Sequence, residues 1–149
     1  MEEGSWKGPL LFFCDGAARG NPGPAAAAFI GFDAEGKLVG RRGEVLGETT
    51  NNVAEYRAVV GAMKFLERLE RGGWARWGVK VFLDSELVVR QIRGEYKVKD
   101  RKLQKLAIEV KRQQEQLPFR ISFFLVGREV NFWADRMVNE KLDEGRSRV

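Results

Sequence analysis

The sequence contains no histidine and a single cysteine among its 149 residues. Without histidine the chain has no imidazole general base, no Ser-His-Asp triad and none of the usual histidine-rich zinc sites. The lone Cys14 excludes an intrachain disulfide and is typical of a protein from a reducing compartment. Its place within an apolar run favours a buried structural thiol over a nucleophile. Any hydrolytic chemistry must therefore rest on other groups.

The sequence also lacks a basic segment followed by an apolar one at its start, and it lacks an apolar run long enough to cross a bilayer. We therefore expect a cytoplasmic protein with no membrane partner. Apolar residues make up 44% of the chain and charged residues 32%, which is the balance of a folded protein. With no repeat or dividing linker, residues 1–149 are expected to form one monomeric domain with its core at about 10–142.

Basic residues outnumber acidic ones, and the formal net charge is +5. This excess favours a polyanionic partner such as nucleic acid. Net charge is not specific, however, because many basic proteins bind no nucleic acid.

Apolar periodicity and turn residues predict an α/β fold with a five-stranded mixed sheet flanked by helices. A three-strand antiparallel meander comes first, and two parallel strands follow, the first strand pairing with the fourth across a right-handed helical crossover. Trp74 and Trp77 precede the fourth strand, and they either cap the core, which is the favoured interpretation, or form a surface platform. Asn131 is expected to cap the last helix. The predicted strands are 10–16, 25–32, 37–46, 79–84 and 121–126, and the long helices are 53–71, 101–116 and one after residue 131.

Two of the predicted strands lead into an aspartate. Asp15 follows the apolar run 10–14, and Asp84 follows the apolar run 79–83. Either aspartate alone is explained as a turn residue. Because the carboxyl ends of central strands carry functional sites in such sheets, the pair predicts two neighbouring carboxylates at one edge.

Two further acids lie on apolar helix faces. Glu55 lies on the stripe of Val59 in the predicted first turn of its helix, and Asp135 shares a stripe with Val138 and Leu142. Each alone is explained by capping or by the helix dipole. Together with the two strand-end aspartates, and without histidine, they suit Mg²⁺ or Mn²⁺ bound through oxygen. Two such ions about 3.5–4 Å apart can clamp the attacking water and the leaving oxygen in phosphoryl transfer.

Four motifs in order resemble those of type 1 ribonuclease H (ribonuclease HI). A lone Gly-Asn-Pro-Gly is usually just a turn, but the four together extend over about residues 10–142. They are Phe-Cys-Asp-Gly at 13–16 with Gly-Asn-Pro-Gly at 20–23, Thr-Thr-Asn-Asn-Val-Ala-Glu-Tyr at 49–56, Asp-Ser-Glu-Leu-Val-Val at 84–89, and the segment 128–136.

The resemblance implies a ribonuclease H-like fold and hydrolysis of the RNA strand of an RNA/DNA hybrid, leaving a 3′-hydroxyl and a 5′-phosphate. It implies two Mg²⁺ or Mn²⁺ ions per site. By position, the metal-binding acids would be Asp15, Glu55, Asp84 and Asp135.

The same resemblance implies the substrate contacts. Asn21, Asn51 and Asn52 match positions that contact the hybrid backbone, and Thr50 matches one that helps to hold a DNA phosphate. Amides suit this role because they can both donate to and accept from a 2′-hydroxyl. The alternative for all four residues is turn formation and helix capping.

The chain departs from many relatives in three ways. First, Arg128 and Glu129 occupy the loop where these relatives carry a histidine, as in the archaeal-type branch of the family, which lacks this histidine. Arg128 is a candidate for contacting the phosphate or the departing product. The alternative is that it is an ordinary solvent-facing residue. Glu86 replaces a frequent glutamine, and a carboxylate can accept a hydrogen bond from substrate but cannot donate one. The extended basic protrusion is missing. Seven basic residues are candidates to replace it or simply form a solvated face: Arg90, Arg93, Lys97, Lys99, Arg101, Lys102 and Lys105.

Two other functions stay open on this fold. One is a non-catalytic nucleic-acid-binding module, although such modules usually lose an acid and this chain keeps all four. The other is a DNA-cutting nuclease of the superfamily. The Thr-Asn-Asn and Gly-Asn-Pro-Gly motifs disfavour it, because the resemblance assigns both to binding of the hybrid. Double-stranded RNA and RNA–DNA junctions stay open as further substrates.

Overall fold

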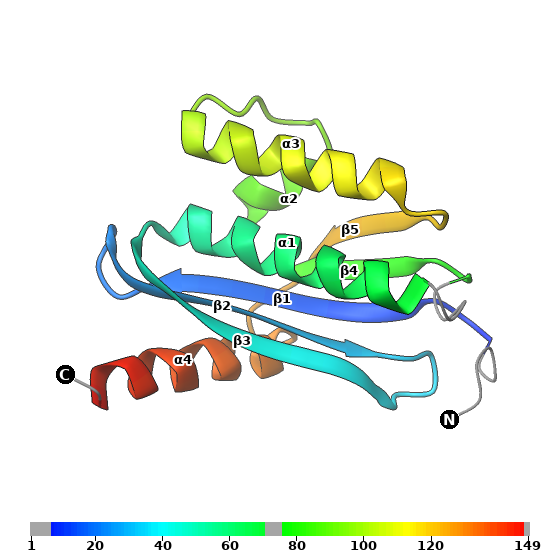
Figure 1. Cartoon of the computed structure of the whole chain (residues 1–149), viewed down its shortest axis with the longest axis horizontal. Helices are drawn as coiled ribbons and strands as arrows, with labels where there is room; N and C mark the ends of the chain where they lie inside the picture. The colour runs from blue at the N-terminus through cyan, green and yellow to red at the C-terminus, as the bar shows by residue number, and fades with distance from the viewer. Residues whose placement is uncertain (1–6, 71–75, 148–149) are drawn as a thin grey trace.

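The computed structural model describes residues 7–70 and 76–147. Its strands form one sheet in the order β3-β2-β1-β4-β5 (Figure 1). The pairs β1–β2 and β2–β3 are antiparallel, and the pairs β1–β4 and β4–β5 are parallel, so the predicted five-stranded mixed sheet is confirmed. The strands are β1 (Leu10–Ala18), β2 (Gly23–Phe32), β3 (Leu38–Thr49), β4 (Val79–Leu83) and β5 (Ile121–Leu125).

The helices cover both faces of the sheet. Figure 1 shows α1, α2 and α3 on one face and α4 on the other. Among the residues described, no helix is both long and apolar enough to span a membrane. The helices are α1 (Asn51–Glu70), α2 (Glu86–Ile92), α3 (Arg101–Gln116) and α4 (Phe132–Ser147).

Small side chains on β2 let helices pack on both faces of the sheet. Ala26 and Ala28 lie in a cluster with Val138 and Leu142 of α4. Ala27, between them, belongs to the main core on the α1 side. This alternation follows from the period of two along a strand. It holds α4 close to the strands that carry the predicted site.

Several element boundaries differ from the predicted ones, and so does the position of one tryptophan. β3 runs on to Thr49 because its backbone stays paired with Gly23 at the start of β2. Helix α1 begins at Asn51, because the Thr50 hydroxyl accepts a hydrogen bond from the amide of Val53 at 3.2 Å and caps the helix. Trp77 is 50% exposed, so the prediction that it caps the core is wrong. Trp74 lies outside the described residues.

Candidate active site

Three of the four predicted acids meet at the carboxyl ends of β1 and β4. In the parallel β1–β4 pair, Phe13 is level with Phe82, so Asp15 lies level with Asp84. Glu55 reaches them from α1. One carboxylate oxygen from each of Asp15, Glu55 and Asp84 lies within 4.8 Å of the others. The three acids that the strand ends and the apolar stripe of α1 predicted to be neighbours therefore lie together.

Helix α1 rests directly on the backbone of β1 at Gly16. The Gly16 amide donates a hydrogen bond to Glu55 Oε1 at 2.9 Å. A Cβ at residue 16 would overlap the backbone carbonyl of Ala54, so glycine is required for this close approach. Glu55 lies beyond the first turn, contrary to prediction, because α1 begins at Asn51. The contact with Gly16 holds one carboxylate oxygen and leaves the other for the site.

The carboxylates of this triad oppose one another electrostatically. Burial, together with the negative charges of Asp84 and Asp135, raises the pKa of Asp15 to about 6. Burial and the neighbouring Asp15 raise the pKa of Glu55 well above its usual range. Burial also raises the pKa of Asp84, while the Asn131 amide and Arg128 oppose this rise. Such a cluster is costly unless a cation neutralises it.

The donor set fits a hard divalent cation. All three ligand groups are carboxylates, which suit Mg²⁺ or Mn²⁺. Glu55 Oε2 is buried and has no hydrogen-bond partner within the described parts of the chain. A buried carboxylate oxygen rarely goes unpaired, so this atom is suited to bind a metal ion.

Asp135, the fourth predicted acid, does not lie within the triad. It lies in the first turn of α4, as expected, but its side chain is exposed, whereas Val138 and Leu142 of the predicted shared stripe are buried. The prediction of an inward-facing acid is therefore wrong. Its charge nevertheless raises the pKa of both Asp15 and Asp84, so Asp135 lies at the rim of the site.

Asn131 is a site residue whose role the sequence analysis missed. It is fully buried and donates hydrogen bonds to the carbonyl of Cys14 at 2.8 Å and to Asp84 Oδ2 at 3.5 Å. The predicted capping role is not what its side chain does. An asparagine before an apolar helix has the same sequence signature whether it caps that helix or bonds to distant strands. Asn131 ties the start of α4 to β1 and orients one carboxylate of the triad.

We expect Asn131→Ala to lower the free energy of unfolding by about 2 kcal/mol, because it leaves the buried Cys14 carbonyl unpaired. Urea unfolding measures this change. Asn139→Ala in the following helix α4 is the matched control, since Asn139 is exposed and donates a hydrogen bond to the backbone one turn earlier. We expect it to change stability by less than about 0.5 kcal/mol. Equal effects of the two substitutions would contradict the tethering role of Asn131.

We expect the metal-free protein to lose stability as the pH rises from about 4 to about 6. The pKa of Asp15 is near 3.8 when exposed and about 6 in the fold, so the folded state binds more protons between these values. The loss should be on the order of 2 kcal/mol. Urea unfolding in EDTA at a series of pH values measures it. Asp15→Asn should flatten the profile, and a wild-type profile that is flat or rises over this range would contradict the expectation.

Two of the three predicted substrate asparagines, Asn21 and Asn51, have their oxygens engaged within the protein. Asn51 Oδ1 accepts a hydrogen bond from the amide of Ala18 at 2.8 Å, and Asn21 Oδ1 accepts one from the amide of Asn51 at 3.0 Å. These bonds fasten the turn after β1 to the start of α1. Asn21 and Asn51 are exposed, Thr50 and Asn52 are half-buried, and Thr50 caps the helix. Asn21 and Asn51 therefore keep their NH₂ groups as donors, whereas their oxygens are already bonded within the protein.

Arg128 and Glu86 flank the triad on the solvent side. Arg128 is exposed, and its charge opposes the rise in the pKa of Asp84, so the guanidinium lies within electrostatic reach of the site. Glu86 opens α2, and its carboxylate accepts a hydrogen bond from Arg90 at 3.0 Å. Arg90 also pairs with Glu95. Before Glu86 or Arg90 could contact a substrate, these exposed ion pairs would have to open, at little energetic cost.

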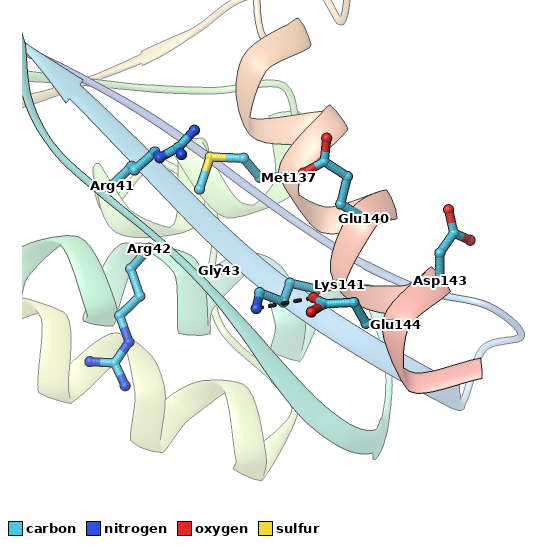
Figure 2. Close-up of a pocket in the computed structure, with 8 residues that line it drawn as sticks. All are labelled: Arg41, Arg42, Gly43, Met137, Glu140, Lys141, Asp143 and Glu144. Atoms are coloured by element: carbon cyan, nitrogen blue, oxygen red, sulfur yellow. Dashed lines mark ion pairs between the residues drawn. The ribbon is translucent and has the colours of Figure 1, made fainter. Parts of the chain in front are cut away.

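A surface groove of about 630 Å³ lies between β3 and α4 (Figure 2), and none of the four predicted acids lines it. Its charges are mixed and partly paired: Lys141 binds Glu144 at 3.1 Å, and Asp143 binds Arg19 at 2.8 Å. The groove therefore offers no concentrated charge of one sign. It is lined by Arg41, Arg42, Gly43, Met137, Glu140, Lys141, Asp143 and Glu144.

Comparisons with known proteins agree with this arrangement. The family model described as reverse transcriptase-like matches residues 13–141. A bifunctional protein of Mycobacterium tuberculosis is 36% identical over 135 residues, which are 90% of this chain and 35% of that protein, so the chain spans about a third of its length. A ribonuclease HI of Halobacterium salinarum is 34% identical over 139 residues, or 92% of this chain and 66% of the relative. The crystal structure of LC11-RNase H1, isolated from compost, in complex with an RNA/DNA hybrid matches with a TM-score of 0.85 and 37% identity, covering 91% of this chain and 98% of that one.

Proposed function

Because the chain belongs to the type 1 ribonuclease H family, we propose that it hydrolyses the RNA strand of RNA/DNA hybrids and leaves a 3′-hydroxyl and a 5′-phosphate. The observation that carries the proposal is the triad of Asp15, Glu55 and Asp84, whose ligand oxygens lie within 4.8 Å of one another on this fold. A structural neighbour that bears an RNA/DNA hybrid supports the substrate class.

In this proposal, Asp15, Glu55 and Asp84 hold the divalent cations, with Asp135 completing the set from the rim. Two bound Mg²⁺ or Mn²⁺ ions would supply Lewis-acid activation and charge neutralisation at the scissile phosphate. The Gly16 amide fixes one oxygen of Glu55. Asn131 orients the Asp84 carboxylate from α4. No histidine is available to move a proton.

The remaining side chains would position the substrate. Asn21 and Asn51 offer NH₂ donors, and their oxygens are already engaged, which suits recognition of an acceptor such as a 2′-hydroxyl oxygen. Asn52 would add a backbone contact, and Thr50 would help to hold a DNA phosphate. Arg128 would contact the phosphate or the departing product, because it lies within electrostatic reach of Asp84. Glu86 would accept a hydrogen bond from the hybrid once released from its ion pair with Arg90.

A gel assay on a hybrid with a labelled RNA strand tests the proposal. The assay is run with Mg²⁺, with Mn²⁺ and with EDTA, beside labelled duplex RNA, an RNA–DNA junction and duplex DNA. Metal-dependent cutting of the RNA strand is the expected result. Binding without cutting would indicate a non-catalytic module, and cutting of duplex DNA would indicate a DNA nuclease. A monomeric state and a cytoplasmic location stay predictions.

A further inference from the structure

Two exposed aromatic side chains open helix α4 beside the acid triad. Phe132 is 51% exposed and Trp133 is 46% exposed, and their ring centroids lie 4.9 Å apart. Aromatic residues are weak helix formers, and the first turn of a helix favours polar or acidic residues. Neither capping nor core packing therefore accounts for the pair. We call Phe132 and Trp133 the aromatic shelf.

The shelf differs from the other exposed aromatic side chains. The guanidinium carbon of Arg76 lies over the ring of Trp77, 5.8 Å from its centroid. That of Arg90 lies over the ring of Tyr96, 5.5 Å from its centroid. Within the described residues, no cation is stacked on either ring of the shelf; the two rings contact each other and remain about half exposed. Aromatic surface is thus available on the shelf for an external planar group.

The position of the shelf points to a substrate strand. Asn131, directly before Phe132, donates to Asp84, so the start of the shelf is fixed beside the triad. Phe132 also lies three residues before Asp135 and therefore on the same side of α4 as the acid at the rim. Trp133 lies beside Phe132, with the ring centroids 4.9 Å apart, so a strand whose phosphate reaches the triad has both rings within reach.

The chemistry of the rings selects the part of the strand that they bind. Bases within a duplex stack on one another, whereas an unpaired base leaves its face free to stack on an aromatic side chain. We propose that Phe132 and Trp133 form a stacking platform for an unpaired nucleotide of the RNA strand where that strand leaves the hybrid. The inference rests on the proposed function and names a preferred substrate: hybrids flanked by single-stranded RNA.

Binding measurements on the full chain test the platform. The Asp84→Asn protein, which is expected to be inactive, is used with Mg²⁺, and its affinity is measured by fluorescence anisotropy. The substrates are a blunt hybrid and the same hybrid with a short unpaired RNA extension at one end or at the other. We expect the extension at one of the two ends to stack one base on the shelf. That extended hybrid should bind about tenfold more tightly than the blunt hybrid. Adding Phe132→Ala and Trp133→Ala should remove this advantage. Adding Trp77→Ala instead, which deletes a tryptophan of similar exposure, should keep it.

The outcomes separate this inference from the proposed function. A protein that neither binds nor cleaves hybrids would overturn the proposed function, and the inference with it. A protein that binds hybrids with no advantage for the extension, or whose double variant keeps the advantage, would overturn the platform alone. Self-association of the wild type that the double variant abolishes would also overturn it, because the shelf would then be a protein contact.

Discussion

Asp84→Asn is expected to lower cleavage of an RNA/DNA hybrid by at least about 10³-fold, while the metal-free protein stays as stable as the wild type or becomes more stable. Lewis-acid stabilisation is worth several kcal/mol, and each 1.36 kcal/mol corresponds to a factor of ten in rate. The substitution also removes one negative charge from a cluster whose members raise one another's pKa. The amide oxygen of the new residue can still accept the hydrogen bond from Asn131.

Two measurements on the same preparation check this expectation. Single-turnover cleavage gives the loss of rate, and thermal unfolding with and without Mg²⁺ shows whether metal binding stabilises the fold. The wild type should gain stability from Mg²⁺, and Asp84→Asn should gain less. Glu35→Gln is the control, because Glu35 is an exposed acid in the β2–β3 turn at the opposite end of the sheet. Wild-type turnover in Asp84→Asn would contradict the metal-binding role of Asp84.

The sequence predicted the features that depend on local periodicity. Apolar runs that lead into Asp15 and Asp84 identified the strands that pair in parallel, and the parallel register then made the two carboxylates neighbours. The stripe of α1 likewise identified Glu55 as a buried acid. These predictions succeeded because the pattern of apolar residues along the chain is the main signal of secondary structure that a single sequence carries.

Features that depend on contacts between distant segments were not predictable in this way. Asn131 contacts Cys14, 117 residues away along the chain, and nothing in its neighbours distinguishes that contact from helix capping. The outward position of Asp135 depends on how α4 is rotated against β2, and the apolar residues of α4 define that rotation only to within a stripe about 100° wide. The engaged oxygens of Asn21 and Asn51 arise where the turn after β1 meets the start of α1.

Gly16→Ala is expected to lower the free energy of unfolding by about 3 kcal/mol or more. The protein that still folds is expected to cleave the hybrid more slowly than the wild type. The added Cβ would overlap the backbone carbonyl of Ala54, and backbone cannot move aside as a flexible side chain can. Relief requires α1 to shift away from β1. That shift would stretch the 2.9 Å bond from the amide of residue 16 to Glu55 and displace this acid from the triad. Alanine also reduces the entropy of the unfolded chain, but by only about 0.4–1 kcal/mol, so the steric cost prevails.

Gly61→Ala makes the same chemical change on α1 with the opposite expected sign. Its Cβ would meet only the ring of Phe29 at 3.6 Å, which is ordinary van der Waals contact. Replacing a helical glycine there should stabilise the protein by about 0.5–1 kcal/mol. Urea unfolding of both variants, with cleavage rates measured below the unfolding transition, compares them directly. A Gly16→Ala protein that keeps wild-type stability and rate would show that α1 can move away from β1 without disturbing Glu55, and the close contact at Gly16 would then not be what positions this acid.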